Sequence, residues 1–221
     1  MLLGRTRLIT LVISALLLSG VAFADSTVSM AFIGPGGNNG GGVYTYPYNF
    51  SINGGAPTSL ICDAFDNEVI SGETWTANMS SLLSGNGLWG NNLTDYKAAG
   101  LIFEDILSGN INATTGNWAI WGLFSSNAQG NSFFQNSGAA ALGSLYLTAA
   151  ANAPSSEFNG FVLYTPIAGT QSWGGMPQEY IGYNPCYSAP EPGSLLLCGI
   201  AFVTIGTGLF GKFRSPLVKP N

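Results

Sequence analysis

The sequence predicts an α+β fold: a small antiparallel β-sandwich or barrel with a helical insert at about residues 94–152. Three observations lead to this prediction. Segments with strand character flank a middle region with helical periodicity, Gly- and Asn-rich turns separate the strands, and an apolar segment lies at each extremity of the 221-residue chain. The extremities are excluded from the fold, which leaves a body of residues 25–189.

Four strands are expected before the insert, because short runs of β-branched and aromatic residues alternate with turn residues. The clearest alternation places Tyr44, Tyr46, Tyr48 and Phe50 on one face. The expected strands are 26–32, 43–52, 60–65 and 74–79. The glycine-rich stretch 34–42 is interpreted as a linker, since it lacks the following helix and Lys of a phosphate-binding loop.

Helical spacing of apolar residues replaces this alternation in the insert. Gly109 is the expected stop of the first helix. Three helices are expected: one capped by Thr94 and ending near Leu107, one at 117–124, and one capped by Ser137 and ending before Pro154. Strand character returns at 161–167 and 179–183, and we expect these last strands to close against the early ones.

The N-terminal segment Met1–Ala24 has the organisation of a secretory signal peptide. Arg5 and Arg7 precede an apolar run, and Ala22-Phe23-Ala24 has small residues at the cleavage spacing. We expect cleavage before Asp25 and export of the body. The alternative is an uncleaved N-terminal anchor.

The C-terminal segment combines a motif, an apolar run and a basic end. Pro190, Glu191 and Pro192 precede an uncharged apolar run, and cations follow it at Lys212, Arg214 and Lys219. The run predicts a transmembrane helix at 194–210, with the cations on the cytoplasmic side. This order of parts resembles the PEP-CTERM sorting signal, here at 190–219.

The resemblance implies an exported protein of a Gram-negative bacterium. Such a protein is held in the inner membrane by its C-terminal helix and is then passed to the cell surface or extracellular matrix. It implies processing near Pro190-Glu191-Pro192 by a membrane protease of the exosortase class. The alternative is an ordinary C-terminal anchor helix.

The charge of the body excludes several function classes. Lys97 is its only cation, and all of the chain's 11 acids except Glu191 lie within it. Such a surface repels phosphate backbones, so we expect no nucleic-acid partner. The chain contains no His, which excludes Ser-His-acid triads and His metal sites.

Cys62 and the helical segment from Asn117 to Trp121 are the main chemical candidates. A tyrosine-rich strand, a Cys-Asp pair and a later Ala119-Ile120-Trp121 motif resemble thioester domains of bacterial surface adhesins. In that family a Cys thiolate attacks a Gln side-chain amide, and the thioester is captured by surface amines. The resemblance gives Cys62 the role of the thioester Cys and places Asn117 where the Gln stands.

Asn is one methylene shorter than Gln, so its carbonyl carbon lies about 1.5 Å further back. Attack needs about 3–3.5 Å between the nucleophile and its carbon. We therefore expect a thioester-domain scaffold in which Cys62 and Asn117 meet without a covalent bond. A formed Cys62–Asn117 thioester is the alternative.

Two further covalent bonds compete with the thioester. Cys198 lies in the predicted span, so Cys62 and Cys186 are left to form a disulfide in an oxidising compartment. Lys97 and Asn117, with Glu104 or Asp105, have the residue types of an intramolecular isopeptide bond. A solvated Lys97 on a helix face is the simpler interpretation.

Asp63, Asp66 and Glu68 belong to the densest group of carboxylates and are the candidate calcium ligands. Their spacing is not that of an EF-hand, and a solvated loop is the alternative. Exposed Trp75, Trp89 or Trp173 could stack on sugars, whereas most Trp side chains belong to a core.

Together these features predict a non-enzymatic surface protein, structural or adhesive within an extracellular polysaccharide matrix. The expected partners are the membrane, an exosortase-type protease, and polysaccharide or surface amines. No cofactor is expected apart from the candidate calcium. The alternatives are a secreted carbohydrate-active enzyme using two carboxylates and a calcium- or glycan-binding module.

Overall fold

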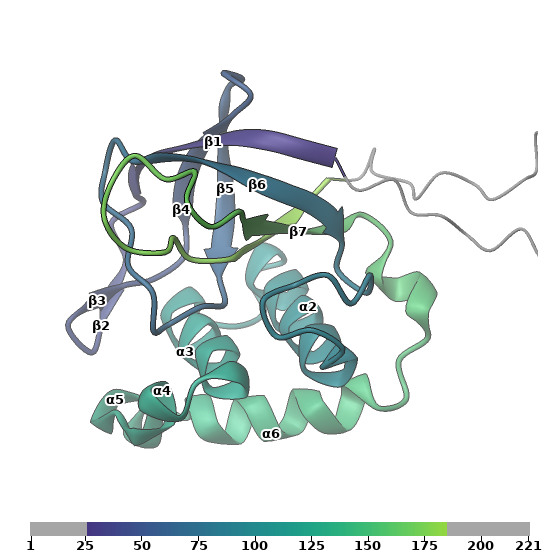
Figure 1. Cartoon of the computed structure of the whole chain (residues 1–221). Helices are drawn as coiled ribbons and strands as arrows, with labels where there is room; N and C mark the ends of the chain where they lie inside the picture. The colour runs from purple at the N-terminus through teal and green to yellow at the C-terminus, as the bar shows by residue number, and fades with distance from the viewer. Residues whose placement is uncertain (1–25, 185–221) are drawn as a thin grey trace, which may run out of the picture. The chain divides into compact units, whose positions relative to one another are not determined.

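The computed structural model describes residues 26–184, whose strands form a closed antiparallel barrel. The order around the barrel is β1-β4-β5-β8-β7-β6 (Figure 1). Their bounds are β1 (Ser26–Pro35), β4 (Tyr48–Ile52), β5 (Pro57–Cys62), β6 (Thr74–Ser81), β7 (Phe161–Pro166) and β8 (Tyr180–Tyr183). The predicted α+β class is confirmed, and the sheet is a barrel rather than a sandwich.

The last two strands complete the barrel by entering between the early ones. Strand β8 pairs with β5, with Cys62 opposite Tyr180, and β7 pairs with β6. The expectation that the terminal strands close against the early ones is confirmed. This register brings the end of β5 beside the segment that enters β8, so residues distant in sequence become neighbours there.

Aromatic side chains fill the barrel. Phe50 lies at its centre, with ring centroids 5.1 Å from Phe32, 4.6 Å from Tyr180 and 5.6 Å from Trp75. The edge-to-face pairs with Tyr180 and Trp75 add to the stabilisation from burial alone. Trp75 is only 2% exposed, so it is a core residue and offers no surface for a sugar.

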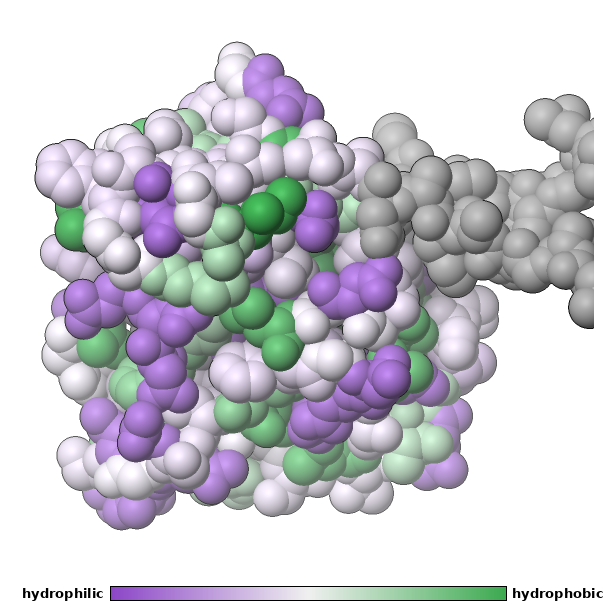
Figure 2. Space-filling view, viewed as in Figure 1, coloured by the Kyte–Doolittle hydropathy of each residue, from purple (hydrophilic) through white to green (hydrophobic). Residues whose placement is uncertain are grey.

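The helical insert lies between β6 and β7, as predicted. It contains α2 (Leu93–Leu107), α3 (Ala113–Phe124), α4 (Ser126–Gly130), α5 (Ser132–Asn136) and α6 (Ala139–Ala150), and the 3-10 helix η1 (Ser155–Phe158) follows. Helices α2 and α3 lie between the barrel and α6 (Figure 1). The face seen in Figure 2 intermixes hydrophilic and hydrophobic residues over both layers.

The helix ends differ in part from the prediction. Thr94 lies inside α2, whose N-cap is Asn92, and Gly138 rather than Ser137 occupies the N-cap of α6. Helix α3 begins at Ala113, before the predicted start, because Asn112 accepts hydrogen bonds from the backbone N–H groups of Thr114 and Thr115. Gly109 follows α2 with φ 73°, as its role as a helix stop requires.

Two strand predictions were wrong in their bounds. The stretch 43–52 is interrupted at Pro47, which has no N–H for a ladder and follows Tyr46 through a cis peptide bond. Strand β5 begins and ends earlier than the predicted 60–65. The stretch 34–42 is not a linker, because β2 (Asn39–Gly40) and β3 (Val43–Tyr44) form an ordered hairpin there.

Several predictions fall outside residues 26–184: the signal peptide Met1–Ala24, the sorting motif Pro190-Glu191-Pro192, the helix at 194–210, and Cys186. Within 26–184, no helix is both long enough and apolar enough to cross a bilayer.

Candidate functional site

Asn117 joins the helical layer to the barrel at the end of β5. Its Nδ2 atom donates to the backbone carbonyl of Cys62 at 2.9 Å, and its Oδ1 atom accepts from the backbone N–H of Tyr46 at 2.8 Å. The structure therefore brings the two sequence-predicted residues Cys62 and Asn117 into contact. The contact uses the backbone of Cys62.

The rest of the predicted motif supports this contact by packing. Ala119, Ile120 and Trp121 are buried with Asn117 in α3. Phe65, just after β5, lies 5.3 Å from the ring of Trp118 and 5.2 Å from that of Trp121. A buried amide side chain needs hydrogen-bond partners within the fold, and Asn117 has one for its donor and one for its acceptor.

The Cys62 thiol is fully buried and is the free cysteine of the described residues. Burial raises the pKa of the Cys62 thiol well above its ordinary value, and the charges of Asp63 and Glu179 raise it further. The Trp121 side chain opposes this rise in part. Its indole N–H makes no hydrogen bond of normal geometry within 26–184, so we regard this contact as weak.

These surroundings disfavour a thiolate. A nucleophilic Cys needs a neighbouring cation, base or helix N-terminus to stabilise its charge, whereas the charged neighbours of Cys62 are carboxyls. The Asn117 amide also forms hydrogen bonds through both its nitrogen, which donates to the Cys62 carbonyl, and its oxygen, which accepts from the Tyr46 N–H. The geometry supports a noncovalent contact and provides no means of activating the thiol.

Asp63 and Glu179 form a buried carboxyl pair next to Cys62. Both residues have 0% exposure, and the backbone N–H of Asp63 donates to the carbonyl of Glu179 at 3.3 Å. Burial raises the pKa of Asp63 well above its usual range, and the charge and hydrogen bonding of Glu179 raise it further. The raised pKa of Asp63 favours the protonated form of its carboxyl.

The two carboxyls differ in the partners around them. Glu179 accepts from the Tyr96 hydroxyl at 2.6 Å, from the Leu88 backbone N–H at 2.9 Å, and from the Thr165 hydroxyl. Ionised carboxylates can only accept, and within 26–184 no donor reaches either side-chain oxygen of Asp63. Protonation resolves this, because a protonated Asp63 can donate to Glu179.

The predicted metal ligands do not come together. Asp63 lies inside the fold, whereas Asp66 and Glu68 are exposed, and Asp66 accepts from the Asn127 side chain at 2.7 Å. Within residues 26–184, no group of three or more His, Cys, Asp or Glu side chains is arranged to hold a metal ion. Three carboxylates that converge would be needed for a calcium site of the predicted kind.

Lys97 is not placed for an isopeptide bond with Asn117. Its Nζ atom donates to the carbonyl of Ala153 at 2.8 Å and lies 5.7 Å from the ring centroid of Phe158. Asn117 has different partners, the backbone groups of Cys62 and Tyr46. Asp105 is likewise engaged by the Tyr146 hydroxyl.

A pocket of about 540 Å³ lies beside this site and is called the aromatic pocket below. Two of its lining residues connect it to the site: the Trp121 side chain contacts Cys62, and Tyr48 lies close enough to Cys62 for the charge of a thiolate to raise the pKa of Tyr48. Its lining comes from β1, the hairpin, the start of β4, the loop after β5, helices α3 and α4, and the segment before β8: Phe32, Gly42, Val43, Tyr44, Tyr48, Phe65, Asp66, Asn67, Glu68, Val69, Trp121, Asn127 and Gln178.

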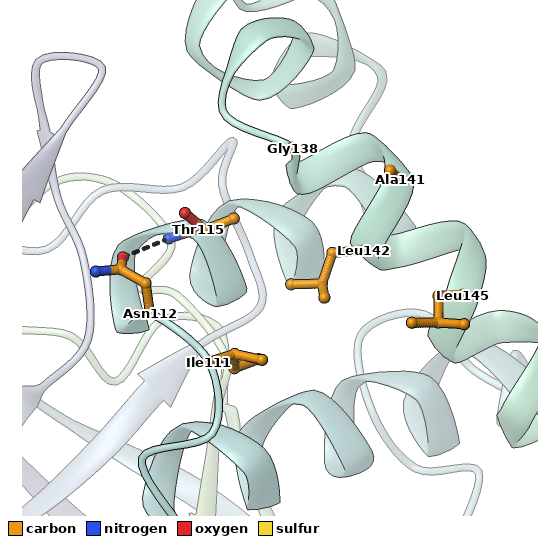
Figure 3. A pocket seen from close by; sticks show the side chains of 7 residues that line it. All are labelled: Ile111, Asn112, Thr115, Gly138, Ala141, Leu142 and Leu145. Atoms are coloured by element: carbon orange, nitrogen blue, oxygen red, sulfur yellow. Dashed lines mark hydrogen bonds between the residues drawn. The ribbon is translucent and has the colours of Figure 1, made fainter.

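A second, mostly apolar pocket of about 420 Å³ lies between the start of α3 and α6. Figure 3 shows Leu142 and Leu145 of α6 on one side and Ile111 on the other, with the Asn112 cap at its edge. It contains no titratable side chain and only Asn112 and Thr115 as polar side chains. Nothing in its lining selects a particular ligand.

Comparison of the chain with protein-family models, with curated proteins and with solved structures finds no match in any of the three. The resemblances to PEP-CTERM tails and to thioester domains therefore stay predictions.

Sequence reasoning missed Glu179 and Tyr46, which complete the buried polar contacts. Glu179 lies at the entry to β8, and only the β5–β8 pairing brings it beside Asp63. Tyr46 contributes its backbone N–H, a group that every residue except Pro carries, so the residue type at this position does not reveal its role. An acid that directly precedes an apolar strand, as Glu179 does, is a usable signal for a buried carboxyl.

Proposed function

We propose that the chain is an exported, non-enzymatic surface protein, whose body is held outside the membrane by a PEP-CTERM tail. Its role is structural or adhesive within an extracellular polysaccharide matrix. The observation that carries this proposal is the order of segments at the C-terminus: Pro190-Glu191-Pro192, an uncharged apolar run, and a basic end.

Features of the body support a passive role. Asn117 is held between two backbone groups, and the Cys62 thiol lies in surroundings that disfavour its ionised form. The buried carboxyl pair Asp63 and Glu179 lines neither described pocket, so a substrate has no route to it there. These features favour a stable scaffold over the alternative of a glycosidase with two reactive carboxylates.

The test measures the length of the chain, detected through an internal epitope, in Gram-negative cells that do or do not express an exosortase. We expect loss of Met1–Ala24 in both, and removal of the tail only where the protease is present. Replacing Pro190, Glu191 and Pro192 together by Ala should leave the chain full-length in the membrane.

A matched control replaces one Pro and one Glu of the exposed body surface, Pro57→Ala and Glu157→Ala, and should be processed like the wild type. Full-length chain found soluble in the cytoplasm, with its N-terminal segment retained, would overturn the proposal. Processing of the triple variant at the normal rate would overturn its sorting part alone.

A further inference from the structure

We propose that the aromatic pocket binds the ammonium group of an amino sugar within a polysaccharide. The pocket's volume of about 540 Å³ lies within the range typical of small-molecule sites. Its lining alone sets its recognition chemistry. The polymeric source of the ligand rests on the proposed function.

The charge of the lining selects a cation. Asp66 and Glu68 are the only charged residues that line the pocket, and both are exposed acids. Lys97, the only cation of the body, is engaged with Ala153 and Phe158 and does not line the pocket. Anionic sugars such as uronates would meet uncompensated repulsion here.

The hydrogen bonds of the lining also favour a ligand that donates. Each of the three lining amides uses side-chain N–H within the protein: Asn67 donates to Pro177, Asn127 to Asp66, and Gln178 to both Ala64 and Asn67. The Asp66 and Glu68 carboxylates keep acceptor capacity beyond the Asn127 contact. An ammonium group carries three donors and no acceptor, so it matches this lining.

Aromatic side chains provide the remaining selectivity. Tyr44 is 54% exposed, Phe65 is partly buried, and Tyr48 and Trp121 are buried behind them. Aromatic faces attract organic cations and stack against the C–H face of a pyranose ring. A metal ion would gain nothing from these walls, and residues 26–184 bring together no three or more His, Cys, Asp or Glu side chains that could hold one.

The test is calorimetric titration of the full chain in detergent micelles with a glucosamine tetramer at neutral pH. The neutral N-acetylglucosamine tetramer and a uronate tetramer are the comparison ligands. We expect the glucosamine tetramer to bind at least tenfold more tightly than the neutral one, and the uronate not to bind. Equal affinity for the charged and neutral tetramers would overturn the proposal.

The variant Asp66→Asn with Glu68→Gln should lose the preference for glucosamine. Its matched control, Glu104→Gln with Glu157→Gln, removes exposed acids elsewhere and should keep the preference. If the pocket variant melts early, Tyr44→Ala at the exposed rim replaces it and should weaken binding severalfold. Unchanged affinity in a folded pocket variant would overturn the proposal.

An oligolysine peptide distinguishes the source of the ammonium group. Binding as tight as that of the glucosamine tetramer would overturn the assignment to an amino sugar. These titrations use purified chain and do not depend on export or processing. Failure of the pocket and failure of the sorting proposal are therefore distinguishable.

Discussion

Two consecutive residues at the end of β5 illustrate opposite outcomes for buried polar groups. The carbonyl of Cys62 receives a hydrogen bond from Asn117, which also binds Tyr46, so every group in that contact is paired. The carboxyl of Asp63, one residue later, depends on a proton to interact with Glu179. Whether a buried polar group has a hydrogen-bond partner decides whether it stabilises or destabilises the folded state. Removing the side chain of Asn117 should therefore lower stability, whereas replacing the Asp63 carboxyl should raise it.

The largest effect is expected from Asn117→Ala. The change leaves a part-buried N–H at Tyr46 and a buried carbonyl at Cys62 without their partner, and an unpaired buried group costs about 1–3 kcal/mol. We expect the free energy of unfolding of the full chain to fall by about 3 kcal/mol in urea titrations.

Two controls accompany this measurement. Asn117→Asp keeps the acceptor for Tyr46 but loses the donor to Cys62, so it should also destabilise the protein. Asn136→Ala, at an exposed position of α5, should change stability by less than about 0.5 kcal/mol. A loss below this level for Asn117→Ala would refute the bridging role.

The intact mass of the wild type tests the covalent alternative in the same samples. A Cys62–Asn117 thioester would lower the mass by one ammonia, and we expect no such loss. A Cys62–Cys186 disulfide would instead be detected by a change in thiol labelling after reduction.

A smaller effect of opposite sign is expected from Asp63→Asn at pH 8. The pKa of Asp63 is higher in the folded state than its unfolded value of about 3.9. The stability that its bound proton contributes is therefore fully present below the unfolded pKa. This stability is lost as the pH rises toward the folded pKa. The loss amounts to at most about 1.4 kcal/mol per pH unit. An amide can donate to Glu179 without ionising, so the variant should be about 2 kcal/mol more stable at pH 8.

The measurement is a urea titration at several pH values from 5 to 8. Other titratable groups near Asp63 are Glu179, Cys62, Tyr96 and Tyr180. The variant should flatten the decline in stability with pH, whereas the exposed Asp66→Asn should leave the decline as in the wild type. A parallel decline in Asp63→Asn and wild type would show that Asp63 is ionised in the folded protein.

The sequence predicted the order of strands, insert and strands because hydrophobic periodicity records which face of each element is buried. It also paired Cys62 with Asn117, through a motif. It did not predict the pairing of Asp63 with Glu179, which depends on the β5–β8 register. The short helices α4 and α5 were missed because their Ser, Asn and Gln residues carry little apolar periodicity.

The β2–β3 hairpin was missed because glycine composition alone favours a flexible linker. In the structure the hairpin packs on α3, where Trp118 Nε1 donates to the Gly40 carbonyl at 3.1 Å. A side chain there would prevent this close approach. The glycines thus permit packing, which composition cannot reveal.

The smallest effect is expected from comparing Gly41→Ala with Gly42→Ala. Both glycines have positive φ, 66° and 85°, so each substitution carries a backbone cost of about 1–2 kcal/mol. A Cβ at Gly41 would lie 2.7 Å from Trp118 Cζ2, whereas at Gly42 nothing lies within 4 Å. Gly41→Ala should therefore cost about 1 kcal/mol more in urea unfolding. Equal costs would show that the hairpin does not stay packed on α3 in solution. The side of the aromatic pocket that the hairpin forms would then not be fixed.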